Sequence, residues 1–175
     1  MRKIFWFIFS PFFGKVKFPS YIGKPVCIVG IKKIFIGNRV RIYPNVRLEV
    51  HGKNSKLIIS DNVGIAQNVH ITTGSVLTIG KGTTILANVF ITDIDHDYSE
   101  INVPILEQKN IIKKTTIGEN CFIGIGAAIQ AGTILGKQCI VGANSVVRGE
   151  FPDYCVIVGT PARIVKKFNF ETNKW

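Results

Sequence analysis

In the second half of this chain of 175 residues, an aliphatic residue recurs at every sixth position from Ile117 to Val147 without a miss. An α-helix repeats its apolar positions every 3.6 residues and a β-strand every two, so a period of six fits neither element alone. It fits a chain that turns a corner every six residues and points one aliphatic side chain inward each time. Three such hexads close a triangular coil, and stacked coils share one core, as in solenoid proteins.

The same phase recurs upstream of this stretch. The expected inward aliphatic positions are Ile36, Ile42, Leu48, Ile59, Ile65, Ile71, Ile79, Ile85, Ile91, Ile117, Ile123, Ile129, Leu135, Val141 and Val147. The residue after the aliphatic one is often glycine, which we interpret as backbone freedom at a tight corner. The residue four positions after it is small or β-branched, as suits a narrow interior. A sandwich of short strands would alternate with period two between its turns, and this chain does not.

The phase breaks at three places, and each break predicts a change in the coil. The polar segment 51–56 and the pair Thr73-Gly74 are expected to lengthen corners. The gap from Ile91 to Ile117 is 26 residues, one coil of 18 plus eight, so a loop must leave the solenoid at about residues 93–114. We expect an apolar, basic lead at 1–20, a β-solenoid domain at 21–167 and a C-terminal tail at 168–175.

The formal net charge is +11, and its distribution is uneven along the chain. Residues 1–56 hold twelve Lys and Arg and one acid, whereas residues 57–175 hold ten of each sign. The apolar run Ile4–Phe13 in this region is too short to span a bilayer. Its aromatic and basic residues suit an interfacial segment on an anionic membrane leaflet. The alternative is a hydrophobic segment that covers the open end of the solenoid or packs on a neighbouring subunit.

Two further compositional features exclude classes of protein. No recognisable nucleic-acid-binding module is present, so no nucleic-acid partner is expected. The four cysteines lack zinc-finger and redox spacing, which is typical of a reducing, cytoplasmic compartment. The three histidines are spaced by 19 and 26 residues, unlike the closely spaced zinc ligands of a β-helical carbonic anhydrase, so no metal is expected.

The hexads, the tract from Asn88 to His96 (NVFITDIDH) and the ending Val158–Arg163 (VGTPAR) resemble the hexapeptide-repeat transferase family over roughly residues 30–167. These proteins are left-handed parallel β-helix acyltransferases. Within the family the sequence is most similar to sugar O-acetyltransferases of surface-polysaccharide synthesis and of the maltose/galactoside type. The left hand of the coil is implied by the resemblance alone. The general preference for right-handed crossovers predicts the opposite hand.

The best catalytic candidate is His96, because it lies among acidic residues in the predicted loop. Acetyl transfer to a hydroxyl needs a base of near-neutral pKa, and a neighbouring carboxylate can orient the imidazole. Asp93 and Asp95 are close enough in sequence to do so, and the resemblance aligns His96 with the family's catalytic histidine. His70 is expected one coil away, where the maltose/galactoside enzymes have an asparagine that assists at the carbonyl. A surface histidine with no role remains the alternative for His70.

The resemblance implies acetyl-CoA as the acyl donor. The family holds the pantetheine arm between coils of neighbouring subunits by backbone amides of small residues, and Gly124 and Ala143 match such positions. Arg148 could meet a CoA phosphate, and Arg163 and Lys166 match basic residues near the nucleotide end. Ordinary solvated surface charge is the alternative for these cations.

These observations favour an acetyltransferase that moves an acetyl group from acetyl-CoA to a hydroxyl of a sugar or surface-polysaccharide precursor, with His96 as general base. The alternatives are a serine O-acetyltransferase, an amino-sugar N-acyltransferase and a non-catalytic β-helical scaffold or binding module. The family's site lies where two subunits meet, so we expect a homotrimer. The sequence does not identify the acceptor.

Overall fold

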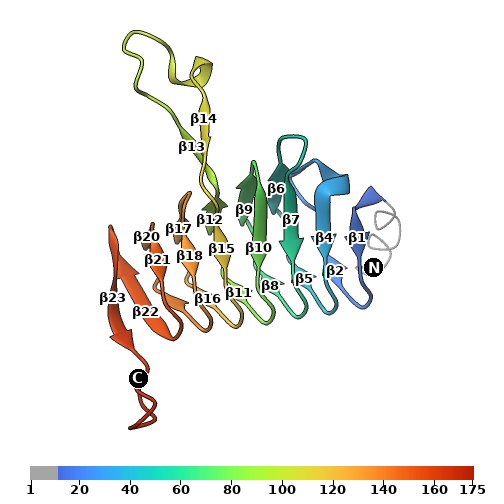
Figure 1. Cartoon of the computed structure of the whole chain (residues 1–175). Coiled ribbons are helices and arrows are strands. Elements are labelled where there is room, and N and C mark those ends of the chain that lie inside the picture. Colours follow the sequence, from blue (N-terminus) through green and yellow to red (C-terminus); the bar gives the residue numbers. More distant parts are fainter. Residues whose placement is uncertain (1–11) are drawn as a thin grey trace.

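A computed structural model describes residues 12–175, which form a solenoid of short strands in three parallel sheets (Figure 1). Sheet A contains β1 (Lys15–Val16), β4 (Ile34–Ile36), β7 (Lys56–Ile59), β10 (Val76–Ile79), β15 (Thr116–Ile117), β18 (Ile134–Leu135) and β21 (Glu150–Phe151). Sheet B contains β2 (Tyr21–Ile22), β5 (Arg41–Ile42), β8 (Gly64–Ile65), β11 (Thr84–Ile85), β16 (Phe122–Ile123), β19 (Ile140–Val141), β22 (Cys155–Gly159) and β23 (Ala162–Lys167). Sheet C contains β3 (Cys27–Val29), β6 (Arg47–Val50), β9 (His70–Thr73), β12 (Phe90–Thr92), β17 (Ala128–Ile129) and β20 (Val146–Val147).

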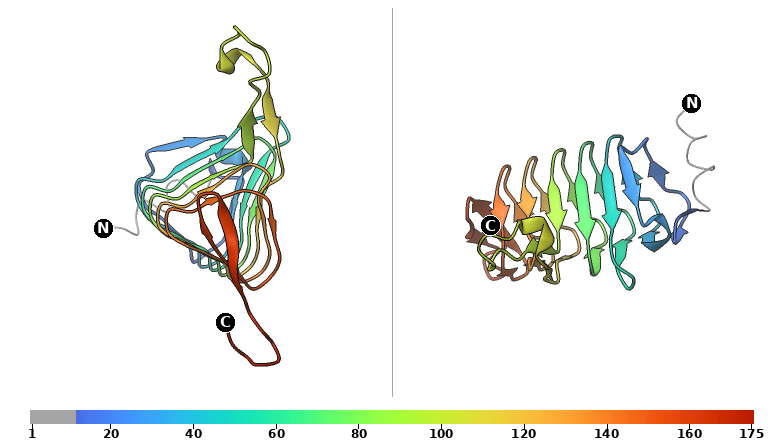
Figure 2. Two further views of the ribbon diagram at one scale, coloured as in Figure 1. Left: turned by 90° about the vertical axis from the view of Figure 1, so that its left-hand side faces the viewer. Right: turned by 90° about the horizontal axis from the view of Figure 1, so that it is seen from above.

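Seen along its axis, the solenoid has the triangular cross-section that the hexads predict (Figure 2). Equivalent aliphatic residues pair in register from coil to coil, as Ile59, Ile79 and Ile117 do in sheet A. All fifteen predicted inward positions are buried, none more than 2% exposed. The sequence therefore predicted the all-β solenoid and its phase correctly. The left hand of the coil stays a prediction from the resemblance.

The corner glycines have a different role from the one expected of them. Gly80, Gly118 and Gly124 do not have positive φ angles. A Cβ atom at Gly118 would lie 2.3 Å from the carbonyl oxygen of Gly136 on the next coil, so these positions need glycine for close approach of coils. The left-handed backbone falls two residues later in the hexad, on glycine at Gly82 (φ 72°) and on asparagine at Asn62 (φ 58°) and Asn120 (φ 56°). Asparagine tolerates this conformation better than other non-glycine residues.

The solenoid begins before the expected boundary at residue 21, because β1 already pairs with β4 in sheet A. The lead predicted at 1–20 thus contributes its last residues to the first coil, and residues 1–11 lie outside the described part. Two short 3₁₀ helices, η2 (Ile31–Lys33) and η3 (Ile105–Glu107), interrupt the strands. Among residues 12–175, no helix has the length and apolar character needed to cross a bilayer.

The predicted loop is a hairpin that stands away from the solenoid (Figure 1). Its antiparallel strands β13 (Ile94–His96) and β14 (Asn110–Ile112) connect β12 of sheet C to β15 of sheet A. Beyond the last coil, β23 folds back antiparallel on β22, and an isolated bridge between Asn169 and Lys174 closes the tail.

Candidate active site

The base of the hairpin places His96 beside the outer face of sheet C. His96 is the last residue of β13, and its side chain is exposed. It lines a pocket of about 350 Å³ together with His51, Thr72, Phe90, Thr92, Ile94 and Asn110. The sequence placed His96 in an excursion, but only the fold shows that β9, β12 and His51, which follows β6, supply the opposite wall.

Asp95 binds two cations at the base of the hairpin rather than the imidazole of His96. Its carboxylate accepts a hydrogen bond from the guanidinium of Arg148, the residue after β20, and Lys113 Nζ lies 3.7 Å from Oδ2. The backbone N–H of His96 donates to Oδ1 at 3.1 Å. Burial alone would raise the pKa of Asp95, but the hydrogen bonds from Arg148 and from the His96 backbone lower it below its ordinary value. Asp95 is therefore an anion that ties the hairpin to the solenoid.

Asp93 is fully buried and lies inside the corner between β9 and β10. Its two oxygens accept hydrogen bonds from Thr73 Oγ1 at 2.6 Å, Gly74 N at 2.7 Å, Ser75 N at 3.1 Å and Ser75 Oγ at 2.6 Å. Four donors occupy this carboxylate, so it has no free capacity to orient a base. Within residues 12–175, neither Asp93 nor Asp95 hydrogen-bonds to the ring of His96, and the expected orienting role is not seen for either.

An acidic centre that the sequence pattern did not predict lies next to this pocket. Glu49 is only 7% exposed, and its Oε1 lies 2.7 Å from Arg47 Nη2. Its other oxygen, Oε2, lies 3.3 Å from His70 Nε2 and 3.8 Å from His51 Nε2. Burial would raise the pKa of Glu49, but the hydrogen bonds from Arg47 and His70 lower it below the ordinary range. Glu49 was visible in the sequence as the only acid among the first 56 residues.

His70 therefore has a partner and a fixed place. Its ring contacts Phe90 on the next coil, with 5.1 Å between ring centroids, and its Nε2 bonds to Glu49. Phe90 lines the His96 pocket and also a smaller one of about 160 Å³, which includes Asp95 and Arg148. The structure thus brings His70 and His51 to the same face of sheet C as His96.

The residues expected to bind CoA lie farther toward the C-terminal coils. The amide of Gly124 donates a hydrogen bond to the Val141 carbonyl at 2.8 Å. This amide therefore joins two neighbouring coils and is not free to bind pantetheine. Ala143 lies directly on Gly124, is exposed, and its amide has no partner among residues 12–175. Arg148 is engaged by Asp95. Arg163 and Lys166 both lie exposed on β23.

Comparison with known proteins places these features in a family. A model described as "Bacterial transferase hexapeptide (six repeats)" matches residues 114–149. The putative lipopolysaccharide biosynthesis O-acetyl transferase WbbJ of Escherichia coli is 36% identical over 91% of this chain and 82% of its own length. The galactoside O-acetyltransferase of Lactococcus lactis is 31% identical, over 79% of this chain and 66% of its own.

A solved structure has the same fold. AntD, an N-acyltransferase from Bacillus cereus in complex with dTDP and 3-hydroxybutyryl-CoA, superposes with a TM-score of 0.79. The match covers 95% of this chain and 89% of AntD at 21% identity. At that identity the likeness concerns the architecture and does not extend to the acceptor.

Proposed function

The chain belongs to the hexapeptide-repeat transferase family, and we propose that it moves an acetyl group from acetyl-CoA to a hydroxyl of a sugar or surface-polysaccharide precursor. The enzyme class, an acyltransferase, follows from the family. The sugar hydroxyl is supported by the similarity to WbbJ over most of both chains and by the galactoside enzyme.

The observation that carries the proposal is the pocket in which His96 faces the outer surface of sheet C. The pocket is polar on several sides, through His51, Thr72, Thr92 and Asn110, while Phe90 and Ile94 supply apolar surface. Hydroxyl and amide groups beside an aromatic ring suit a sugar, which presents hydroxyls at its edge and C–H groups on its faces. At about 350 Å³ the pocket is large enough for a small acceptor.

In this proposal His96 accepts the proton of the acceptor hydroxyl while the hydroxyl oxygen attacks the thioester carbonyl of acetyl-CoA. The carbon–sulfur bond then breaks, the proton passes to the departing sulfur, and the products are an acetyl ester and free CoA. Asp95 acts indirectly, because its bonds to Arg148 and to the His96 backbone hold the end of β13 in place. His70, fixed by Glu49 and Phe90, is the candidate to polarise the carbonyl.

Acetyl-CoA is proposed to lie along the later coils. The free amide of Ala143 is the group in that region best suited to the pantetheine arm, and Arg163 and Lys166 offer positive charge for phosphates. We also propose a homotrimer, in which a neighbouring subunit completes the groove, and a place at the cytoplasmic face of the membrane.

A thiol-release assay tests the proposed reaction. Purified protein is given acetyl-CoA and, in turn, free sugars, nucleotide sugars, lipid-linked saccharides, amino sugars and serine. The proposal predicts acceptor-dependent release of CoA with saccharide hydroxyls, and an ester in the product that hydroxylamine cleaves. Release with serine alone, or an amide product stable to hydroxylamine, would instead identify a serine O-acetyltransferase or an N-acyltransferase.

A further inference from the structure

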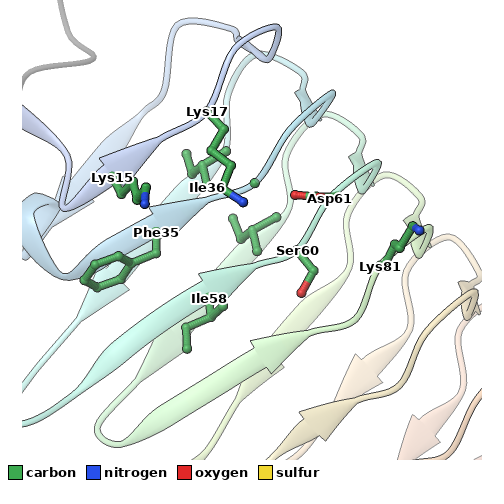
Figure 3. A pocket seen from close by; sticks show the side chains of 10 residues that line it. Lys15, Lys17, Phe35, Ile36, Ile58, Ser60, Asp61 and Lys81 are labelled. Atoms are coloured by element: carbon green, nitrogen blue, oxygen red, sulfur yellow. The ribbon is translucent and has the colours of Figure 1, made fainter.

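A further hollow lies on sheet A, on the first coils of the solenoid and on a different sheet from the His96 pocket (Figure 3). Its volume is about 340 Å³. Its floor includes Phe35 and Ile58, which point outward from β4 and β7, and Lys15, Lys17 and Lys81 lie around it (Figure 3). We call it the lysine groove.

The three lysines of this groove have exposed side chains. Within the described residues, no carboxylate lies within ion-pair distance of Lys15, Lys17 or Lys81. Asp61 is the acid that lines the groove, and its Oδ1 accepts a hydrogen bond from the Asn38 backbone at 2.8 Å. The groove therefore combines an excess of exposed positive charge with an apolar floor.

We propose that the lysine groove is a docking site for the phosphate headgroup of an anionic lipid at a bilayer surface. Ammonium groups recognise a phosphate, and the adjacent Phe35 and Ile58 offer apolar contact that a lipid can use and an inorganic anion cannot. Binding to membrane is a property separate from acetyl transfer, and it places sheet A against the bilayer while the His96 pocket on sheet C stays accessible.

The chain around the groove supports a lipid as the occupant. Lys15 and Lys17 follow the apolar run Ile4–Phe13 closely in the sequence. Phe18, the next residue, is 76% exposed. Aromatic residues beside basic ones favour the interface between water and hydrocarbon.

The experiment measures flotation of the full-length protein with phosphatidylcholine vesicles and with equimolar phosphatidylcholine–phosphatidylglycerol vesicles. Each lysine near an anionic surface strengthens binding by about fivefold, so the triple variant Lys15→Gln/Lys17→Gln/Lys81→Gln is expected to partition roughly a hundredfold more weakly into anionic vesicles. The matched control is Lys137→Gln/Lys167→Gln/Lys174→Gln, which removes the same charge from exposed positions at the other end of the chain. This control variant is expected to lose much less of its binding to anionic vesicles.

Two further measurements separate a built groove from general charge attraction. Phe35→Ala is expected to weaken vesicle binding while the slope of binding against salt concentration stays unchanged. Glycerol 3-phosphate, as a soluble competitor, is expected to displace the protein only poorly.

Three results would overturn the proposal. The first is an equal loss of binding to anionic vesicles in the two triple variants. The second is complete displacement of the protein from vesicles by glycerol 3-phosphate. The third is a change of oligomeric mass in the Lys15/Lys17/Lys81 variant. The last would identify this face as a contact between subunits.

Discussion

Asp93 shows how much of this fold depends on single buried polar side chains. Its four hydrogen bonds hold the corner 73–75 from which sheet C passes into sheet A, next to the start of the hairpin. Sequence spacing suggested that it could serve His96, because distance along the chain does not reveal which donors surround a carboxylate. Only the pairing of coils brings Thr73 and Ser75 onto it.

Asp93→Ala is expected to lower the free energy of unfolding by about 3 kcal/mol, because it leaves buried donors without an acceptor. Urea denaturation followed by circular dichroism measures this, with Asp97→Ala, a partly exposed acid on the same hairpin, as the control. A loss for Asp93→Ala as small as that for Asp97→Ala would contradict the structural role.

Glu49 makes stability depend on pH with a definite sign. Its pKa is lowered in the folded state, so its carboxylate stabilises the fold above the unfolded pKa of about 4.3, and this stabilisation is lost as the pH falls through the folded value. Glu49→Gln should therefore lower the melting temperature at pH 7, and the difference from wild type should shrink below about pH 4. A difference that persists or grows in acid would show that the carboxylate charge is not the cause.

At the level of strands and corners, the hexad phase predicted which residues point inward and where the coil is interrupted. It did not predict the chemistry of the outer face. Arg47, Glu49 and His70 meet because β6 and β9 pair with Arg47 beside His70. That register depends on the length of the corner at 51–56, which the sequence marked as irregular without fixing its geometry. The role of the corner glycines was missed for the same reason, since close approach is a property of two coils.

The groove expected for CoA is tested by Ala143→Trp. A large side chain there should obstruct the exposed surface beside the free amide and weaken CoA binding more than acceptor binding. Isothermal titration calorimetry measures both, with Lys137→Trp as the control, since Lys137 is exposed at the equivalent hexad position of the same coil. Unchanged CoA affinity in a folded Ala143→Trp protein would remove Ala143 from the site.

At the scale of the whole molecule, the hairpin carries large apolar side chains that are exposed in a single chain. Tyr98 is 74% exposed, Ile101 80% and Leu106 87%, on a segment that stands off the solenoid (Figure 2). Exposed apolar side chains of this kind are typical of contacts with another molecule. A closed threefold ring would bury them in the same way in every copy.

Light scattering is expected to give three times the mass of one chain, and Ile101→Ser/Leu106→Ser should dissociate the assembly. Val26→Ser, which changes an exposed apolar residue outside the hairpin, is the control. A stable monomer that retains full activity would contradict the trimer and with it a site shared between subunits.

The central claim is that His96 takes the proton of the acceptor hydroxyl, and the turnover of His96→Ala at saturating acetyl-CoA tests it most directly. Because a general base contributes about 10²–10⁴ in rate, turnover should fall by about a hundredfold or more. The circular dichroism spectrum and oligomeric mass should stay unchanged, because His96 is exposed on the hairpin. Turnover close to wild type in His96→Ala, together with loss of activity in His70→Ala or His51→Ala, would contradict the account and move the base to the histidines beside Glu49.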